Sequence, residues 1–137
     1  MLRKPEALEP GSRVRLIAPA GPFEPRLLRA GVRVLEGLGL VPALERCEFA
    51  RDGFLAGSDA DRAKRLAAAL EERDSRAVWC IRGGYGTARL LPWLDLPALR
   101  RRPKLLIGFS DVTALLVQLA RPGGFVAVHG PVVTQLP

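Results

Sequence analysis

Short apolar runs alternate along the chain with longer segments in which apolar residues recur at helical spacing. Five runs have the length and the β-branched or aliphatic composition of buried strands, and they cover residues 14–18, 40–44, 77–81, 104–107 and 125–128. Strands that are apolar throughout and separated by helices form parallel sheets with helices on both faces. The pattern therefore predicts an α/β fold built on one parallel sheet.

Three segments between these strands have a helical period, at residues 27–38, 63–70 and 112–119. Ser58 stands just before the second of them, where its side chain can accept a hydrogen bond from a first-turn amide. Pro42 cannot donate to a ladder, so the second strand is expected to be weak. Residues 47–57 are expected to form a loop.

The chain has 137 residues and a formal net charge of +7, with 21 Lys and Arg against 14 Asp and Glu. Its length predicts one domain. The arginines are scattered and no aromatic residues interleave with them, so nucleic acid is not expected as a partner. No run of 18 apolar residues and no signal peptide is present, which predicts a cytoplasmic protein without a membrane segment.

The potential metal ligands are few. Cys47 and Cys80 lie 33 residues apart, and His129 is the single histidine. This set is too small for a structural zinc site and fits no redox motif, so no metal is expected. Both cysteines lie in apolar runs, which predicts that they are small buried core residues.

Glycine-bearing turns follow the predicted strands, at residues 19–21, 82–86, 108–111 and 129–131. In an open parallel sheet these turns meet at the carboxyl edge, where ligands bind. The turn at 82–86 can bring bare backbone amides close to a ligand, although it also reads as an ordinary tight turn. It has neither the dinucleotide fingerprint nor a Walker motif, so no nucleotide cofactor is expected.

Ser110 lies where a strand runs directly into a helix, which is the geometry of a nucleophile elbow. The amide of Asp111 would then help to bind an oxyanion at the helix N-terminus. A full elbow has glycine where this chain has Val112, and the simpler interpretation is that Ser110 or Asp111 caps the helix. His129 belongs to the same edge, but a lone histidine there is more typical of a structural role. The chain is therefore expected to lack a complete triad.

Four motifs in order resemble the LD-carboxypeptidases of peptidase family S66. They are AGSDADRA at 56–63, RGGYGTARLLP at 82–92, IGFSDVTAL at 107–115 and HGP at 129–131, and the resemblance extends over residues 14–131. It implies a flavodoxin-like, class I glutamine amidotransferase-like fold, a homodimeric full-length protein and no cofactor. It also implies a serine-type hydrolase that releases the terminal D-alanine from a cytoplasmic murein tetrapeptide, at the L-centre of diaminopimelate, in peptidoglycan recycling.

The resemblance assigns the nucleophile to Ser110 and the oxyanion hole to the amides of Asp111 and of Gly83 or Gly84. Tyr85 and His129 are candidates for positions around the site, and the resemblance does not make His129 a member of the triad. The glutamate and histidine of the family's triad lie in a C-terminal domain, so residues 1–137 correspond to the N-terminal, nucleophile-bearing domain and are expected to be inactive alone.

Other interpretations stay open at this point. A side branch of the family hydrolyses a peptide–nucleotide antibiotic and so gives self-immunity, and a non-catalytic peptide-binding module is a further alternative. A fragment would leave an apolar docking surface, to which the Val- and Leu-rich segment 126–136 is expected to contribute. The sequence leaves the roles of Arg82, Arg89 and Tyr85 undecided.

Overall fold

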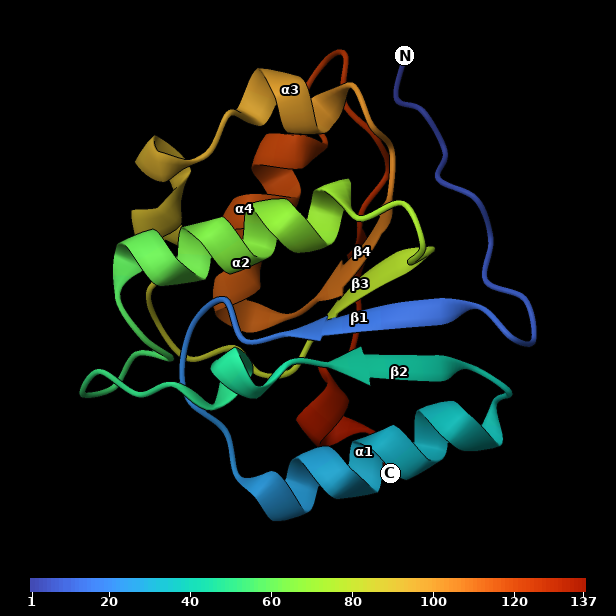
Figure 1. The fold of residues 1–137 in the computed structure, drawn as a ribbon. Helices are drawn as coiled ribbons and strands as arrows, with labels where there is room; N and C mark the ends of the chain where they lie inside the picture. The colour runs from blue at the N-terminus through green and yellow to red at the C-terminus, as the bar shows by residue number, and fades with distance from the viewer.

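A five-stranded parallel sheet organises the chain in the computed structural model, which describes residues 1–137 (Figure 1). The spatial order of the strands is β2-β1-β3-β4-β5, and every neighbouring pair is parallel. The strands are β1 (Arg13–Ile17), β2 (Val41–Leu44), β3 (Ala77–Cys80), β4 (Leu105–Gly108) and β5 (Val128–His129). The predicted α/β fold with one parallel sheet is confirmed.

Helices cover both faces of the sheet. They are α1 (Pro25–Gly37), α2 (Asp59–Glu71), α3 (Leu96–Arg100) and α4 (Thr113–Leu119). In Figure 1, α1 and the C-terminus lie on one face, and α2, α3 and α4 lie on the other. Each face has its own apolar core: Leu28 and Leu35 of α1 belong to one, while Leu66 of α2 and Leu115 of α4 belong to the other. None of the helices has the length and hydropathy that a bilayer span requires.

Four of the five strands lie within about one residue of their predicted positions. The weak strand is β2, which lies at the edge of the sheet, so Pro42 interrupts no central ladder. The fifth strand was predicted at 125–128 but is only Val128–His129. Phe125 instead donates its amide to the carbonyl of Leu119, and Val126 donates to Arg3. The residues before β5 therefore pair with the N-terminal segment, and no local sequence pattern predicts this long-range contact.

Two expectations about apolar residues need correction. Cys80 is fully buried in β3, but Cys47 is exposed because it lies in a short 3₁₀ turn, η1 (Arg46–Phe49), and not in a strand. The segment 126–136 is only partly an exposed apolar surface: Val126 and Val128 are exposed, whereas Val132 and Val133 are buried. The side chain of Val133 is part of the core under α1.

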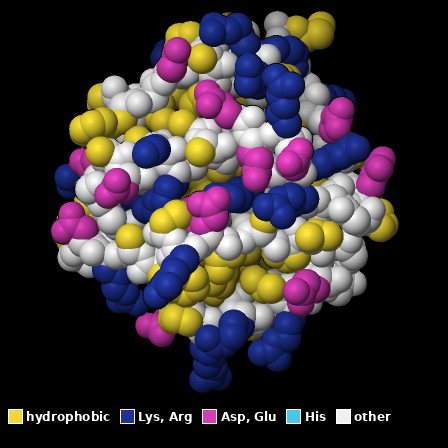
Figure 2. Space-filling model, in the orientation of Figure 1, with side chains coloured by type: hydrophobic (Ala, Val, Ile, Leu, Met, Phe, Trp, Pro, Cys, Tyr) yellow, Lys and Arg dark blue, Asp and Glu magenta, His cyan; other side chains and the backbone are white.

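Figure 2 shows the face that carries α2, β1, β2 and α1. Lys and Arg side chains alternate there with Asp and Glu and form no single basic patch. Apolar side chains gather over β2 and α1, where a groove of about 510 Å³ has Val32, Pro42 and Leu44 among its lining residues and Arg29 and Arg33 at its rim.

The chain from β5 to the C-terminus is fixed against the sheet and α1. The amide and the hydroxyl of Thr134 both donate to the carbonyl of Ile81, at 3.1 and 3.0 Å. A Cβ placed on Gly31 of α1 would lie 2.1 Å from the carbonyl oxygen of Val133. Glycine at position 31 is therefore what allows this close approach.

Replacement of Gly31 by alanine should lower the free energy of unfolding by about 1–3 kcal/mol, because the methyl group forces α1 away from Val133. Gly37→Ala, at the end of the same helix, is the matched control, since a Cβ there meets nothing within 4 Å. That change should be neutral or stabilise the protein by about 0.4–1 kcal/mol. Urea denaturation measures both, and equal effects of the two changes would contradict the packing argument.

Candidate active site

Ser110 has a backbone conformation that side-chain-bearing residues rarely adopt. Its φ is +58°, and it is the one non-glycine residue of the chain with a positive φ. The residue follows β4 after the extended Phe109 and opens a single 3₁₀ turn, η3 (Ser110–Val112), which leads into α4. Such a conformation costs about 1–3 kcal/mol and persists where the surrounding structure enforces it. The turn leaves Ser110 exposed at the carboxyl edge of the sheet.

The capping interpretation of Ser110 and Asp111 is wrong. Neither η3 nor α4 has a side-chain hydrogen bond at its N-cap. The carboxylate of Asp111 instead accepts a hydrogen bond of 2.9 Å from the backbone amide of Thr87. Asp111 therefore connects the start of α4 to the glycine loop that follows β3.

The glycine loop lies directly against Ser110. A Cβ on Gly83 would lie 3.3 Å from the Cβ of Ser110 and 3.7 Å from the amide nitrogen of Asp111. The carbonyl of Gly83 accepts a 3.1 Å hydrogen bond from Gly21, and Gly84 has a φ of +113°. The structure thus brings together Ser110, Asp111 and Gly83, three of the four residues expected to form the nucleophile and the oxyanion hole, while the fourth, Gly84, packs on Gly21.

His129 and Tyr85 lie near this cluster but make no hydrogen bond to Ser110. The ring of His129 packs against Phe109, with centroids 5.0 Å apart. Tyr85 is 55% exposed and its ring lies 5.6 Å from that of Phe54. Both side chains are therefore at the carboxyl edge, where they border the site without reaching the nucleophile.

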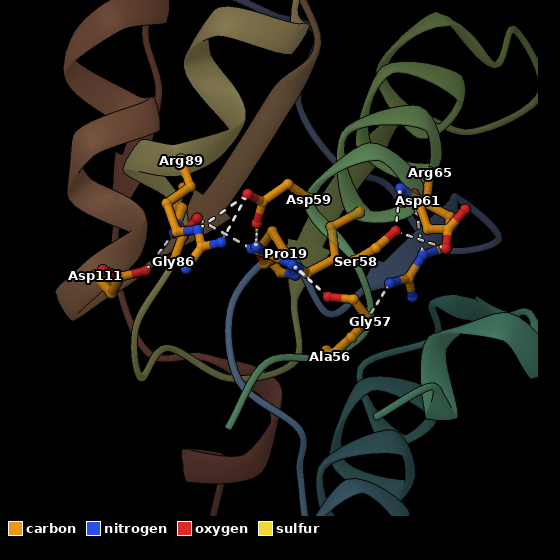
Figure 3. A network of polar contacts seen from close by, with 12 residues as sticks. Pro19, Ala56, Gly57, Ser58, Asp59, Asp61, Arg65, Gly86, Arg89 and Asp111 are labelled. Carbon is orange, nitrogen blue, oxygen red and sulfur yellow. Dashed lines mark hydrogen bonds and ion pairs between the residues drawn. The ribbon is translucent and has the colours of Figure 1, made fainter. Parts of the chain in front are cut away.

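A buried cation, Arg62 of α2, holds the loops of this edge together. Figure 3 labels its partners Pro19, Gly57, Asp59 and Gly86. Its guanidinium donates to the carbonyls of Gly57, Pro19 and Gly86, at 3.1, 2.7 and 3.0 Å, and pairs with Asp59. These acceptors come from three segments, which follow β1, precede α2 and follow β3. Arg62 is 1% exposed, and burial lowers its pKa. Sequence reasoning missed this residue, although the motif at 56–63 contains it.

Asp59 connects this network to the surface. Its carboxylate accepts from Arg62 and, at 3.0 and 2.9 Å, from Arg89, and the hydrogen bond from Arg89 is the main cause of its lowered pKa. Arg89 thus has a role as the exposed partner of Asp59.

A second buried ion pair supports the end of β1. Glu48 is 1% exposed, and its Oε2 accepts from the amide of Ala18 at 2.8 Å and from Arg65 at 2.9 Å. Its other carboxylate oxygen is buried without a hydrogen-bond partner. Burial raises the pKa of Glu48 in spite of both donors. Arg65 also donates to the carbonyls of Cys47 and Ala56, so the pair joins η1, β1 and α2.

Arg62→Met should lower the free energy of unfolding by about 3–5 kcal/mol, because it leaves the buried carbonyls of Gly57 and Pro19 without their donor and removes one of the two donors to Gly86. Arg89→Met removes the other cation from Asp59 at an exposed position and should leave stability close to that of the wild type. Thermal and urea denaturation compare the two variants. Similar losses for both would show that the buried carbonyl contacts contribute little.

Glu48→Gln gives a pH-dependent test. The folded state binds the Glu48 proton more tightly than the unfolded state, so this group stabilises the fold below its ordinary pKa near 4.5 and loses that contribution as pH rises through the raised value. The wild type should therefore lose stability relative to Glu48→Gln between acidic and neutral pH. Urea titrations at several pH values measure this difference, and one that is constant across the range would contradict the prediction.

Comparison with known proteins agrees with this geometry. Residues 14–130 match the family model described as the LD-carboxypeptidase N-terminal domain of Peptidase_S66. The murein tetrapeptide carboxypeptidase of Pseudomonas aeruginosa is 46% identical over 125 residues, which are 90% of this chain and 40% of that protein.

Solved structures are similar over most of this chain. The microcin C7 self-immunity protein MccF has a TM-score of 0.86 at 26% identity, over 100% of this chain and 42% of its own. The muramoyltetrapeptide carboxypeptidase of Oxalobacter formigenes has a TM-score of 0.79 at 29% identity, over 89% and 40%. The chain thus spans about two fifths of the proteins that it resembles. From its sequence, its sheet and its strained serine, the chain belongs to the LD-carboxypeptidase family, peptidase family S66.

Proposed function

We propose that residues 1–137 form the nucleophile-bearing domain of a serine-type LD-carboxypeptidase. The observation that carries this proposal is the positive φ of Ser110 at a strand-to-helix turn with a glycine loop packed against it. That geometry exposes a hydroxyl above the sheet and leaves backbone amides free to face it. A purely structural serine has no need of so costly a conformation.

In the proposed reaction the Oγ of Ser110 attacks the carbonyl carbon of the scissile amide. The amide of Asp111 and that of Gly83 or Gly84 donate to the oxyanion that forms. A general base takes the hydroxyl proton of Ser110 and gives it to the leaving amine as the C–N bond breaks. Water, deprotonated by the same base, then attacks the acyl-serine ester, and the proton returns to the Oγ of Ser110 as the ester bond breaks. No metal or cofactor enters these steps, because the serine is itself the nucleophile.

The general base is proposed to come from outside residues 1–137. His129 packs on Phe109 and does not contact Ser110, and the carboxylate of Asp111 is engaged by Thr87. A glutamate and a histidine in a C-terminal domain would complete the triad, as the family resemblance implies. Loss of the base alone removes about 10²–10⁴-fold in rate, so the isolated chain should be nearly inactive.

The proposed substrate is a murein tetrapeptide, from which the enzyme releases the terminal D-alanine at the L-centre of diaminopimelate. The name of the 46% identical Pseudomonas aeruginosa relative supports this choice. We further propose that the reaction takes place in the cytoplasm during peptidoglycan recycling, in a homodimeric full-length protein without nucleic-acid or membrane partners.

A second candidate is hydrolysis of a peptide–nucleotide antibiotic. Its support is the high structural similarity to the self-immunity protein MccF, one structure of which contains aspartyl sulfamoyl adenosine. The sequence identity of that match is 26%, against 46% for the murein enzyme, and for this reason the murein peptide is the preferred substrate.

The test is a chimera in which residues 1–137 replace the matching segment of the Pseudomonas aeruginosa enzyme. It should release D-alanine from the tetrapeptide in preference to cleaving an aspartyl nucleotide, and Ser110→Ala should reduce kcat by about 10⁴-fold or more. The isolated chain should remain far below about 1 s⁻¹, the lower end for working enzymes.

Thr113→Ala is the matched control, because Thr113 begins α4 one turn from the nucleophile and its side chain makes no hydrogen bond. This variant should keep the activity of the parent chimera. An inactive chimera, or a Ser110→Ala chimera that retains activity, would refute the proposed function. Tight tetrapeptide binding without turnover would favour the non-catalytic module.

A further inference from the structure

A cavity of about 300 Å³ opens at the carboxyl edge of the sheet, between the segment that leads into α1 and the loop after β3. Three charged side chains, Arg51, Arg82 and Glu24, line it together with Thr134. None of the three charged groups forms an ion pair with another part of the chain. Nothing in the proposed reaction at Ser110 uses this cavity.

Both guanidiniums are held by backbone carbonyls at the start of α1. Nη1 of Arg82 donates to the carbonyl of Pro22 at 2.6 Å, and Nη2 of Arg51 lies 3.5 Å from that of Phe23. Gly21 leaves the room for this arrangement, since a Cβ there would lie 3.3 Å from Nη1 of Arg82. The remaining N–H groups of the two arginines are free to bind an anion in the cavity.

The side-chain oxygens of Glu24 and Thr134 can still accept hydrogen bonds from a ligand in the cavity. Glu24 is the N-cap residue of α1, but its side chain makes no capping hydrogen bond. The hydroxyl of Thr134 donates its proton to the carbonyl of Ile81, so its oxygen faces further partners only as an acceptor. The cavity therefore combines two cationic donors with one carboxylate and one hydroxyl acceptor.

The cavity adjoins the nucleophile. Arg82 directly precedes Gly83, and Gly83 packs on Ser110. Neighbouring strands of a sheet lie about 4.8 Å apart, so the end of β3 is one strand spacing from the end of β4. A ligand bound at Ser110 thus needs only a short side branch to reach the cavity.

We propose that this cavity is a subsite for a zwitterionic α-amino carboxylate on such a branch. The carboxylate would bind to the guanidiniums of Arg51 and Arg82, which favour planar, bidentate contacts with carboxylates. The ammonium group would bind to Glu24 and to the hydroxyl oxygen of Thr134. The identification of the ligand rests on the proposed function: the far end of a diaminopimelate side chain is this zwitterion, whereas a lysine side chain ends in an ammonium group alone.

The experiment is a titration of the ¹⁵N-labelled chain with the product tripeptide L-Ala–γ-D-Glu–meso-diaminopimelate, followed by amide chemical shifts. Shifts should centre on Arg51, Arg82 and Thr134. Amidation of the side-chain carboxyl group of the ligand should raise Kd by about tenfold, because a charged hydrogen-bond partner is lost. Acetylation of the side-chain amine should weaken binding in the same way.

Variants assign these effects to the cavity. Arg82→Gln and Arg51→Gln should each reduce the difference in Kd between the ligand with a free side-chain carboxyl group and the amidated ligand. Glu24→Gln should reduce the difference in Kd between the ligand with a free side-chain amine and the acetylated ligand. Arg26→Gln, an exposed arginine of α1 outside the cavity, is the charge-matched control and should keep both differences. The dispersion of the amide spectrum verifies that each variant is folded.

Equal affinity of the wild type for the ligand with a free side-chain carboxyl group and for the amidated ligand would overturn the proposal. Chemical-shift changes confined to other residues would overturn it too. So would the absence of binding at 10 mM ligand, roughly the weakest affinity expected of so few charged contacts. The titration requires no turnover and should give the same result with Ser110→Ala. A titration without binding would therefore not contradict the proposed role of Ser110, and an inactive chimera would not contradict the proposed subsite.

Discussion

The carboxyl edge of this domain depends on one buried cation. A guanidinium in an apolar core is tolerated only if its donors are satisfied, and Arg62 finds its acceptors in carbonyls of the turns after β1 and β3 and ahead of α2. The same requirement therefore fixes the relative positions of three loops that lie far apart in the sequence. Removal of the charge would leave the carbonyls of Gly57 and Pro19 without this donor and the carbonyl of Gly86 with only the amide of Arg89, so the loops and the cation stabilise one another.

The strain at Ser110 is maintained by this framework. The carbonyl of Gly86 accepts a hydrogen bond from Arg62, and the amide of Thr87 donates to the carboxylate of Asp111. Gly83 packs against the serine itself. The glycine loop is thus fixed at one end by Arg62 and Asp111 and packs at the other end against Ser110. A φ of +58° at a serine persists because the surrounding contacts leave the residue no relaxed alternative.

The fold was predictable because its signals are local. Apolar runs and helical periods located four strands and the three longer helices, and the strand-to-helix turn singled out Ser110. The failures have long-range causes: Phe125 pairs with the N-terminal segment and not with β4, and Val133 is buried because Gly31 admits it under α1. Arg62 was missed for the same reason, since a charged residue on a helix gives no local sign that three distant carbonyls surround it.

The division of charged groups around the site follows from their surroundings. Arg62 and Glu48 lie in the core, where water does not reach their charged groups, and most of their partners are backbone groups of several segments. Arg51, Arg82 and Glu24 are exposed and line a cavity, where water can satisfy the N–H groups and carboxylate oxygens that the fold leaves free. Of the first kind, Arg62 is connected to Ser110 through Gly86 and the Thr87–Asp111 hydrogen bond, whereas charges of the second kind have donors and acceptors that the fold leaves free. Under the proposed function, a domain that contains both kinds of charge would position and discriminate a substrate even though the proposed proton-transfer groups lie outside residues 1–137.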